Sequence, residues 1–182
     1  MTKAKSNVVT DFVAPIVVLV LICAVMSGLL AATNNITDPI IKEAERAANE
    51  AARLEVLPAA DNFDQVAAEG LPATVKEVYK AANGAGYTFS ITAQGYGGKN
   101  TLKMAVGVDM DGKITGTKVL SHKETVGLGS KITTDQRFIG DFLSKGASEI
   151  DGIDRISGAT FSSNYYKAAI KDALAAFELV KG

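Results

Sequence analysis

An uncharged, mostly apolar run near the N-terminus constrains this chain more than any other feature. Residues 13–33 contain no Asp, Glu, Lys or Arg. A helix of about 20 such residues is long enough to span the hydrocarbon core of a bilayer. Pro15 falls in the first turn of this run, where a helix tolerates proline. We therefore predict a transmembrane helix over residues 12–33, preceded by a short segment, residues 1–11.

The charges on either side of the run predict its orientation. Lys3 and Lys5 precede it, whereas no basic residue follows it before Lys42. The positive-inside rule then places residues 1–11 in the cytoplasm and the rest of the chain outside. A cleaved signal peptide is the competing interpretation, but the run is long for one and no good Ala-x-Ala site follows it. Cys23 lies within the run, and we interpret it as a buried or lipid-facing thiol. A cofactor contact there, supplied by a partner, stays open.

An alanine-rich segment with helical periodicity follows the apolar run. We expect a helix from Thr37 to about Leu57, capped by Thr37 or Asp38, with Pro39 in its first turn and Pro58 ending it. Its charges are mixed rather than basic, which favours a stalk that continues the anchor over a helix lying on the membrane surface. Residues 34–58 are thus predicted to be a stalk helix.

Residues 59–182 are predicted to form one α+β domain with an antiparallel sheet flanked by helices. Residues 59–70 are expected to be a loop or short helix. Period-2 alternation then predicts strands, and Asp111-Gly112 predicts a hairpin turn. Helical spacing predicts a short helix capped by Thr133 or Thr134, and a longer one capped by Ser162 or Ser163. The predicted strands are 75–79, 87–92, 102–108 and 114–120, and the longer helix is 164–180.

Composition excludes several classes of function. The net charge of −1 gives no basic field, so nucleic acid is not expected as a partner. One cysteine and one histidine are too few for a disulfide framework, a cysteine-rich iron–sulfur site or a histidine-rich metal centre. We also find no nucleophile–base pair and no dinucleotide or P-loop fingerprint, so we expect no catalytic residues and no metal site.

The hydroxyl-rich stretch 154–163 runs directly into the long C-terminal helix. It therefore lies among the free backbone N–H groups at the positive end of that helix, which suit a phosphate. Taken alone, this pattern is also that of an ordinary helix start.

Three motifs occur in order along the domain: Gly95-Tyr96-Gly97-Gly98, then His122-Lys123-Glu124-Thr125-Val126-Gly127-Leu128-Gly129, then Asp154-x-x-Ser157-Gly158-Ala159-Thr160. Together they resemble the covalent FMN-binding domain family, and most nearly the G subunit of Rnf-type ion-translocating electron-transport complexes. Val126 stands where that family usually has proline. The resemblance covers essentially the whole chain, including the anchor.

The resemblance implies a site. FMN would be joined through its phosphate to Thr160 as a phosphoester, and Asp154 would serve recognition by a flavin transferase. The second motif would form another wall of the site, with Glu124 and Thr125 hydrogen-bonding the flavin and Leu128 packing on its ring. The other cofactor-binding residues implied are Ser157, Gly158, Ala159, Ser162, Ser163, Gly127, Gly129, Lys131, Tyr96 and His122.

The resemblance also implies a function. The protein would relay electrons, without being catalytic alone, within a ferredoxin:NAD oxidoreductase coupled to ion movement, commonly of sodium. Its partners would be membrane, iron–sulfur and flavin subunits in a bacterial or archaeal cytoplasmic membrane, with the domain on the extracytoplasmic side. Two alternatives stay open: the C subunit of a sodium-translocating NADH:quinone reductase, and an anchored binding or scaffold module without redox activity.

Overall fold

A computed structural model describes residues 12–181 of the chain. These residues divide into two compact units, with the boundary between Arg46 and Ala47. The boundary between the units falls within the segment predicted to be a stalk. The predicted cytoplasmic segment 1–11, with Lys3 and Lys5, lies outside the described residues.

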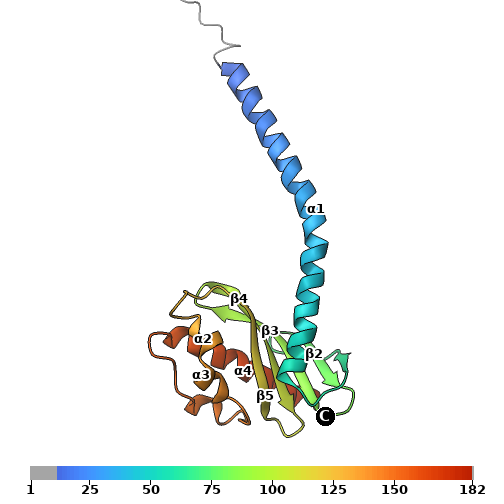
Figure 1. Cartoon of the computed structure of the whole chain (residues 1–182), viewed down its shortest axis with the longest axis vertical. Coiled ribbons are helices and arrows are strands. Elements are labelled where there is room, and N and C mark those ends of the chain that lie inside the picture. Colours follow the sequence, from blue (N-terminus) through green and yellow to red (C-terminus); the bar gives the residue numbers. More distant parts are fainter. Residues whose placement is uncertain (1–11, 182) are drawn as a thin grey trace, which may run out of the picture. The chain divides into compact units, whose positions relative to one another are not determined.

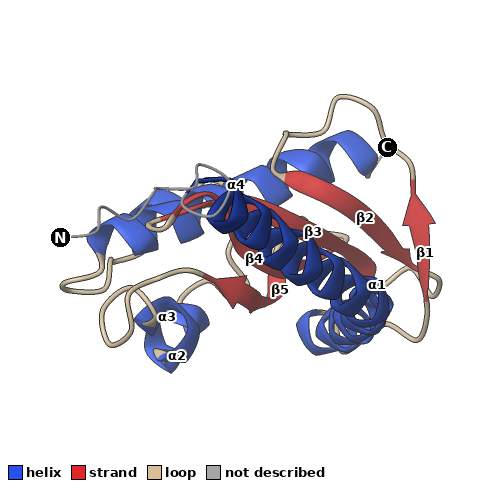
Figure 2. Cartoon of the chain, turned by 90° about the horizontal axis from the view of Figure 1, so that it is seen from above, coloured by secondary structure: helices blue, strands red, loops and turns tan. Residues whose placement is uncertain are grey.

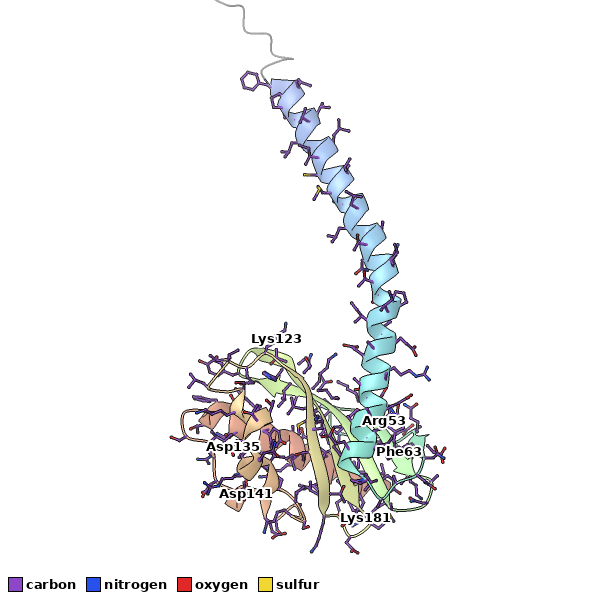
Figure 3. All side chains as sticks on the ribbon, viewed as in Figure 1. Arg53, Phe63, Lys123, Asp135, Asp141 and Lys181 are labelled. Carbon is purple, nitrogen blue, oxygen red and sulfur yellow. The ribbon has the colours of Figure 1, made fainter. Side chains whose placement is uncertain are left out.

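Helix α1 (Ala14–Val56) is one continuous helix of 43 residues. The predicted start of a second helix at Thr37 or Asp38 is wrong, because Pro39 lies inside α1. Helical hydrogen bonding thus resumes beyond a residue that has no N–H to donate. Large apolar side chains project outward along the first part of α1 (Figure 3), and α1 is the one described helix that is long and apolar enough to cross a bilayer. At its other end α1 stops at Val56, two residues before Pro58.

The domain is built on a five-stranded antiparallel sheet whose spatial order, β1-β2-β3-β4-β5, is also its sequence order. The predicted antiparallel sheet flanked by helices is therefore confirmed (Figure 2). The expectation of a loop or short helix over 59–70 is wrong in part, because Phe63–Val66 is a strand that pairs with β2. The strands are β1 (Phe63–Val66), β2 (Val75–Ala81), β3 (Gly86–Gly95), β4 (Gly98–Asp109) and β5 (Ile114–His122).

Helix α4 (Thr160–Val180) runs across one face of this sheet (Figures 1 and 2). Alternate residues of β4, namely Met104, Val106 and Val108, are fully buried in the core on that side. The matching side chains of α4 recur at helical spacing, which is why the sequence could predict this helix. They are Tyr166, Ala169, Ile170, Ala173, Leu174, Ala176 and Phe177, all 2 % exposed or less.

The opposite face of the sheet receives the last turns of α1, which belong to the same unit as the domain. Gly107 of β4 pairs with Gly116 of β5, and a Cβ at Gly107 would come within 2.2 Å of the Val56 carbonyl oxygen. The Thr115 hydroxyl donates to that same oxygen at 2.6 Å. This pair of glycines lets the end of α1 lie directly on the sheet backbone.

Two short helices, α2 (Lys131–Thr134) and α3 (Gln136–Gly140), follow β5 and lie beside it in Figure 1. The predicted caps Thr133 and Thr134 are wrong: both lie within α2, and the Asp135 side chain caps α3 by accepting from the N–H groups of Arg137 and Phe138. Phe138 and Phe142 then pack against the Tyr166 ring of α4, with centroids 5.3 and 5.2 Å away.

Candidate functional site

Three segments that are distant in sequence form a cleft at one end of the domain. They are the β3–β4 turn, the loop that follows β5, and the first turn of α4. The cleft has a volume of about 210 Å³. Lys123, in the loop after β5, marks this end of the domain in Figure 3. The residues that line the cleft are Tyr96, Glu124, Thr125, Leu128, Gly129, Gly158, Ala159, Thr160, Phe161 and Ser162. All three sequence motifs thus contribute to one cavity.

The first turn of α4 leaves backbone donors free at this cleft. The helix begins at Thr160 after Ala159, which makes no side-chain cap bond. The predicted cap at Ser162 or Ser163 is therefore wrong, since both lie inside the helix. No hydrogen bond with another described residue uses the N–H of Phe161 or Ser162 or the exposed Thr160 hydroxyl. Such free N–H groups at the positive end of a helix dipole favour an anion.

The two serines of this turn have separate partners. Ser163 is fully buried, and its Oγ donates to the Ala159 carbonyl at 2.9 Å and accepts the Ile156 N–H at 3.1 Å. It therefore fixes the backbone that leads into the helix and does not line the cleft. Ser162 instead donates from its Oγ to the Glu124 carboxylate. The sequence predicted both serines as cofactor contacts, and Ser162 alone lines the cleft.

Glu124 joins the three segments. Its Oε1 accepts the Tyr96 N–H at 2.8 Å from the β3–β4 turn, and its Oε2 accepts from Ser162 on α4. The Glu124 carboxylate is flanked by two glycines that have no room for a side chain. A Cβ at Gly95 or at Gly129 would come within 2.5 Å of one of the carboxylate oxygens. These two glycines therefore let the turn and the loop close around a buried carboxylate.

Aromatic and aliphatic side chains flank the cleft without being covered by protein. Tyr96 is 63 % exposed, Phe161 65 % and Leu128 51 %. The rings of Tyr96 and Phe161 have centroids 6.4 Å apart and are tilted by 46°. Exposed apolar groups gathered around a concave site are typical of ligand-binding surfaces.

Sequence reasoning missed Phe161 as a site residue. A signal was available, because Phe161 lies nine residues before Ile170. At about 100° per residue it therefore faces away from the buried stripe of α4. An aromatic residue on the exposed face of a helix start has no place in the core, which makes it a candidate for ligand contact.

The remaining predicted residues lie around the cleft rather than in it. His122 accepts the Glu124 N–H on its Nδ1 at 3.2 Å, so it shapes the loop. Gly127 is exposed with φ +78°, and its N–H donates to the Ser130 Oγ. The other three residues predicted for the site, Lys131, Asp154 and Ser157, line a neighbouring groove of about 450 Å³.

A buried lysine supports the backbone just before the Asp154–Thr160 motif. Lys167 of α4 is 6 % exposed, and its Nζ donates to the carbonyls of Asp151 and Ile153 at 3.0 and 2.7 Å. Burial lowers the pKa of Lys167. One turn further along α4, Lys171 pairs with the Asp151 carboxylate at 2.6 Å, and this hydrogen bond lowers the pKa of Asp151. The motif is thus held to the helix that it begins.

These residues fit an FMN group. Free N–H groups suit its phosphate, exposed rings and Leu128 suit its flat apolar ring system, and the Thr160 hydroxyl lies within the same cleft. Among residues 12–181, no group of three or more His, Cys, Asp or Glu is placed to hold a metal ion. The arrangement favours binding of an anionic, aromatic cofactor.

Comparison with known proteins agrees with this geometry. Residues 95–175 match the FMN-binding domain family. The chain is 33% identical over 173 residues to the G subunit of the ion-translocating oxidoreductase complex of Methanosarcina acetivorans, covering 87% of this chain and 88% of that protein.

Two further relatives are each 29% identical. One is the G subunit of the Na⁺-translocating ferredoxin:NAD⁺ oxidoreductase complex of Acetobacterium woodii, with 88% of this chain and 89% of the relative covered. The other is the G subunit of the proton-translocating ferredoxin:NAD⁺ oxidoreductase complex of Clostridium ljungdahlii, with 86% of each covered.

Proposed function

We propose that this chain is a membrane-anchored flavoprotein that relays electrons through FMN. It belongs to the family of G subunits of ion-translocating oxidoreductase complexes. The observation that carries the proposal is the cleft at the start of α4, where exposed rings meet N–H groups and a hydroxyl that bond to no other residue in the described part of the chain. FMN supplies the redox chemistry when it is bound, and this chain binds and orients it.

The proposal includes a covalent link at Thr160. The Thr160 Oγ1 would bond to the FMN phosphorus of a flavin dinucleotide. The P–O bond to the second phosphate of that donor would break, so that a nucleoside monophosphate and the hydroxyl proton of Thr160 would leave. Three features support this choice: Thr160 is exposed, it is the first residue of α4, and its hydroxyl is unbonded among the described residues. The phosphate would then lie beside the free N–H groups of Phe161 and Ser162, which offset its remaining charge.

The chain's own residues have separate roles in this proposal. Tyr96, Phe161 and Leu128 cover the ring system and exclude water from part of it. Lys167 and Ser163 hold the Asp154–Thr160 segment in the conformation that presents Thr160. Asp154, exposed in the neighbouring groove, is proposed to contact the flavin transferase that carries out the modification.

The anchor sets the position of the domain. We propose that α1 crosses the cytoplasmic membrane with the N-terminus inside, so that the flavin lies on the extracytoplasmic side. Other membrane, iron–sulfur and flavin subunits would donate and accept its electrons. Relatives named for sodium and for protons are each 29% identical to this chain, so the similarity favours neither ion.

The test is an intact mass of the denatured chain from cells that also produce a flavin transferase. We expect the wild type to carry the mass of one FMN less one water, and Thr160→Ala to carry none of it. Thr133→Ala is the matched control, because Thr133 lies in α2 outside the residues that line the cleft, so this variant should keep the full added mass. An unmodified wild type, from cells that modify a known flavoprotein, would leave an anchored binding or scaffold module as the better explanation.

The same measurement does not separate this family from the C subunit of sodium-translocating NADH:quinone reductases, which would carry the same modification. The three relatives described above are all named as G subunits, which favours the ferredoxin:NAD⁺ type. Purification of the tagged chain with its partners distinguishes the two, since reduction of NAD⁺ by ferredoxin supports the first and reduction of quinone by NADH supports the second.

A further inference from the structure

We propose that Glu124 is a positioning residue that clamps the cleft closed and keeps the reduction potential of its FMN low. This inference rests on the proposed function and deepens it. The family resemblance implies that Glu124 hydrogen-bonds the flavin directly. The contacts of its carboxylate indicate an additional role, because its two oxygens accept hydrogen bonds from two different segments of the protein.

The clamp follows from where the two donors come from. The Tyr96 N–H belongs to the β3–β4 turn, 28 residues before Glu124, and the Ser162 hydroxyl belongs to α4, 38 residues after it. Tyr96 and Phe161, the residue beside Ser162, carry the two exposed rings of the cleft. Glu124 therefore ties together the two backbone segments that present those rings.

The Glu124 carboxylate is tightly packed. Glu124 is 7 % exposed, and the glycines on both sides of its carboxylate have no room for a Cβ. A Cβ at Gly129 would come within 2.5 Å of Oε2 and 2.6 Å of the Ser162 Oγ. Buried groups packed at this density cannot shift without moving their neighbours. The carboxylate is thus fixed in position at the inner wall of the cleft.

The hydrogen bonds of the Glu124 carboxylate indicate its charge. A carboxylate that accepts on both oxygens and donates from neither has the pattern of the ionised form. Both of its donors are neutral, and among the described residues none of the ion pairs with Lys, Arg or His includes Glu124. A full negative charge therefore remains in the wall of the cleft.

The negative charge of Glu124 affects any group in the cleft whose own charge changes during a reaction. Reduction adds negative charge to a flavin, and a fixed negative charge in a poorly solvated wall opposes that change. We therefore expect oxidised FMN to be favoured over reduced FMN. Removing the charge while keeping the shape of the side chain should raise the reduction potential.

The test compares Glu124→Gln with wild type, using full-length chain loaded with FMN by coexpression with a flavin transferase. Spectroscopic redox titration should show a shift in the oxidised-to-reduced ratio of at least about tenfold towards reduced FMN, or about 30 mV for a two-electron couple. Glu178→Gln is the matched control: it removes a carboxylate that is paired with Lys181 near the other end of α4, about 27 Å along the helix from Thr160 at 1.5 Å per residue, and should leave the potential unchanged.

An unchanged or lower potential in Glu124→Gln overturns the proposal. A second readout needs no flavin, namely the hydrogen exchange of the Tyr96 amide in the Thr160→Ala background. Exchange there should be faster in Glu124→Ala and unaltered in Glu178→Gln. This readout decides the matter if Glu124→Gln takes up no FMN, and unaltered Tyr96 exchange then overturns the clamp. A wild type without FMN contradicts the proposed function, while the exchange result still tests the clamp.

Discussion

The two ends of α4 differ in what their side chains and backbone contact. From Tyr166 to Phe177 the inward residues are almost fully buried against β3, β4 and the α2–α3 segment. In the first turn, Thr160 and Phe161 are exposed and backbone N–H groups are unpaired among the described residues. One helix thus supplies both the core of the domain and the donors of its cleft. The binding site begins where the packing of the helix stops.

Substitutions at the C-terminal part of α4 should therefore affect stability, whereas substitutions in its first turn should affect the cofactor. Burying apolar surface contributes most of the stability of a domain, so it should depend on the C-terminal part of α4. Exposed side chains contribute little to stability, so the first turn is free to carry groups that bind a ligand.

The largest change in stability is expected when an aromatic residue at one end of α4 is replaced by alanine and compared with the same replacement at the other end. Phe177 is 1 % exposed and packs edge-on against Tyr87 at 5.8 Å, so Phe177→Ala should lower the free energy of unfolding by about 3–5 kcal/mol. Phe161→Ala should change it by less than about 0.5 kcal/mol. Denaturant unfolding of the full chain in detergent, followed by circular dichroism, measures both. Equal losses from the two variants would contradict a division of roles along α4.

A pH dependence should also arise from the buried part of the helix. Tyr166 donates to the Thr117 hydroxyl at 2.7 Å, and burial raises its pKa from 10.0 to about 12. The folded state therefore holds this proton more tightly than the unfolded state does. The resulting stability is fully present below pH 10 and is lost as the pH rises to about 12, by up to about 2–3 kcal/mol.

Unfolding measured between pH 9 and pH 12 checks this dependence. Tyr166→Phe should flatten the fall in stability, whereas Tyr165→Phe, at a half-exposed position next to it, should leave the fall as in wild type. An unchanged slope in Tyr166→Phe would show that the alkaline loss has another origin.

The smallest loss of stability is expected for substitutions of glycines at the cleft. There the effect of a steric clash can be distinguished from the effect of backbone strain. Gly129→Ala would force a Cβ against the Glu124 carboxylate and Ser162, so we expect a loss of about 1–3 kcal/mol together with lower FMN loading. Gly127→Ala adds a Cβ into open space at φ +78°, so it should cost about 1–2 kcal/mol in strain and leave FMN loading unchanged. Flavin absorbance per folded chain distinguishes the two outcomes, and normal loading in Gly129→Ala would count against the clamp.

Much of the fold could be predicted because its signals are local. Alternation along 87–92 and 102–108 and the Asp111-Gly112 turn predicted three strands of the meander. Strand β1 was missed because it has only four residues, with Asp64 and Gln65 in its middle, and it is specified by pairing with β2. The continuity of α1 through Pro39 was missed because proline is read locally as a helix start.

The site could be predicted only in part, for a related reason. The three motifs identified the segments, but spacing along the chain does not show that Glu124 contacts Ser162, 38 residues away. The start of α4 was placed too late because Ser162 and Ser163 have the chemistry of caps. Their hydroxyls are instead taken by Glu124 and by the Ala159 carbonyl, which are tertiary and backbone contacts that the sequence pattern does not reveal.

The central claim is that the first turn of α4 carries the flavin, and the most direct test is to locate the modification by peptide fragmentation. Trypsin cutting after Arg155 and Lys167 releases residues 156–167. Besides Thr160, this peptide contains the hydroxyls of Ser157, Ser162, Ser163, Tyr165 and Tyr166. We expect the fragment ions to assign the mass of FMN less water to Thr160 alone. Its assignment to one of the serines, or to a peptide elsewhere in the chain, would contradict that claim.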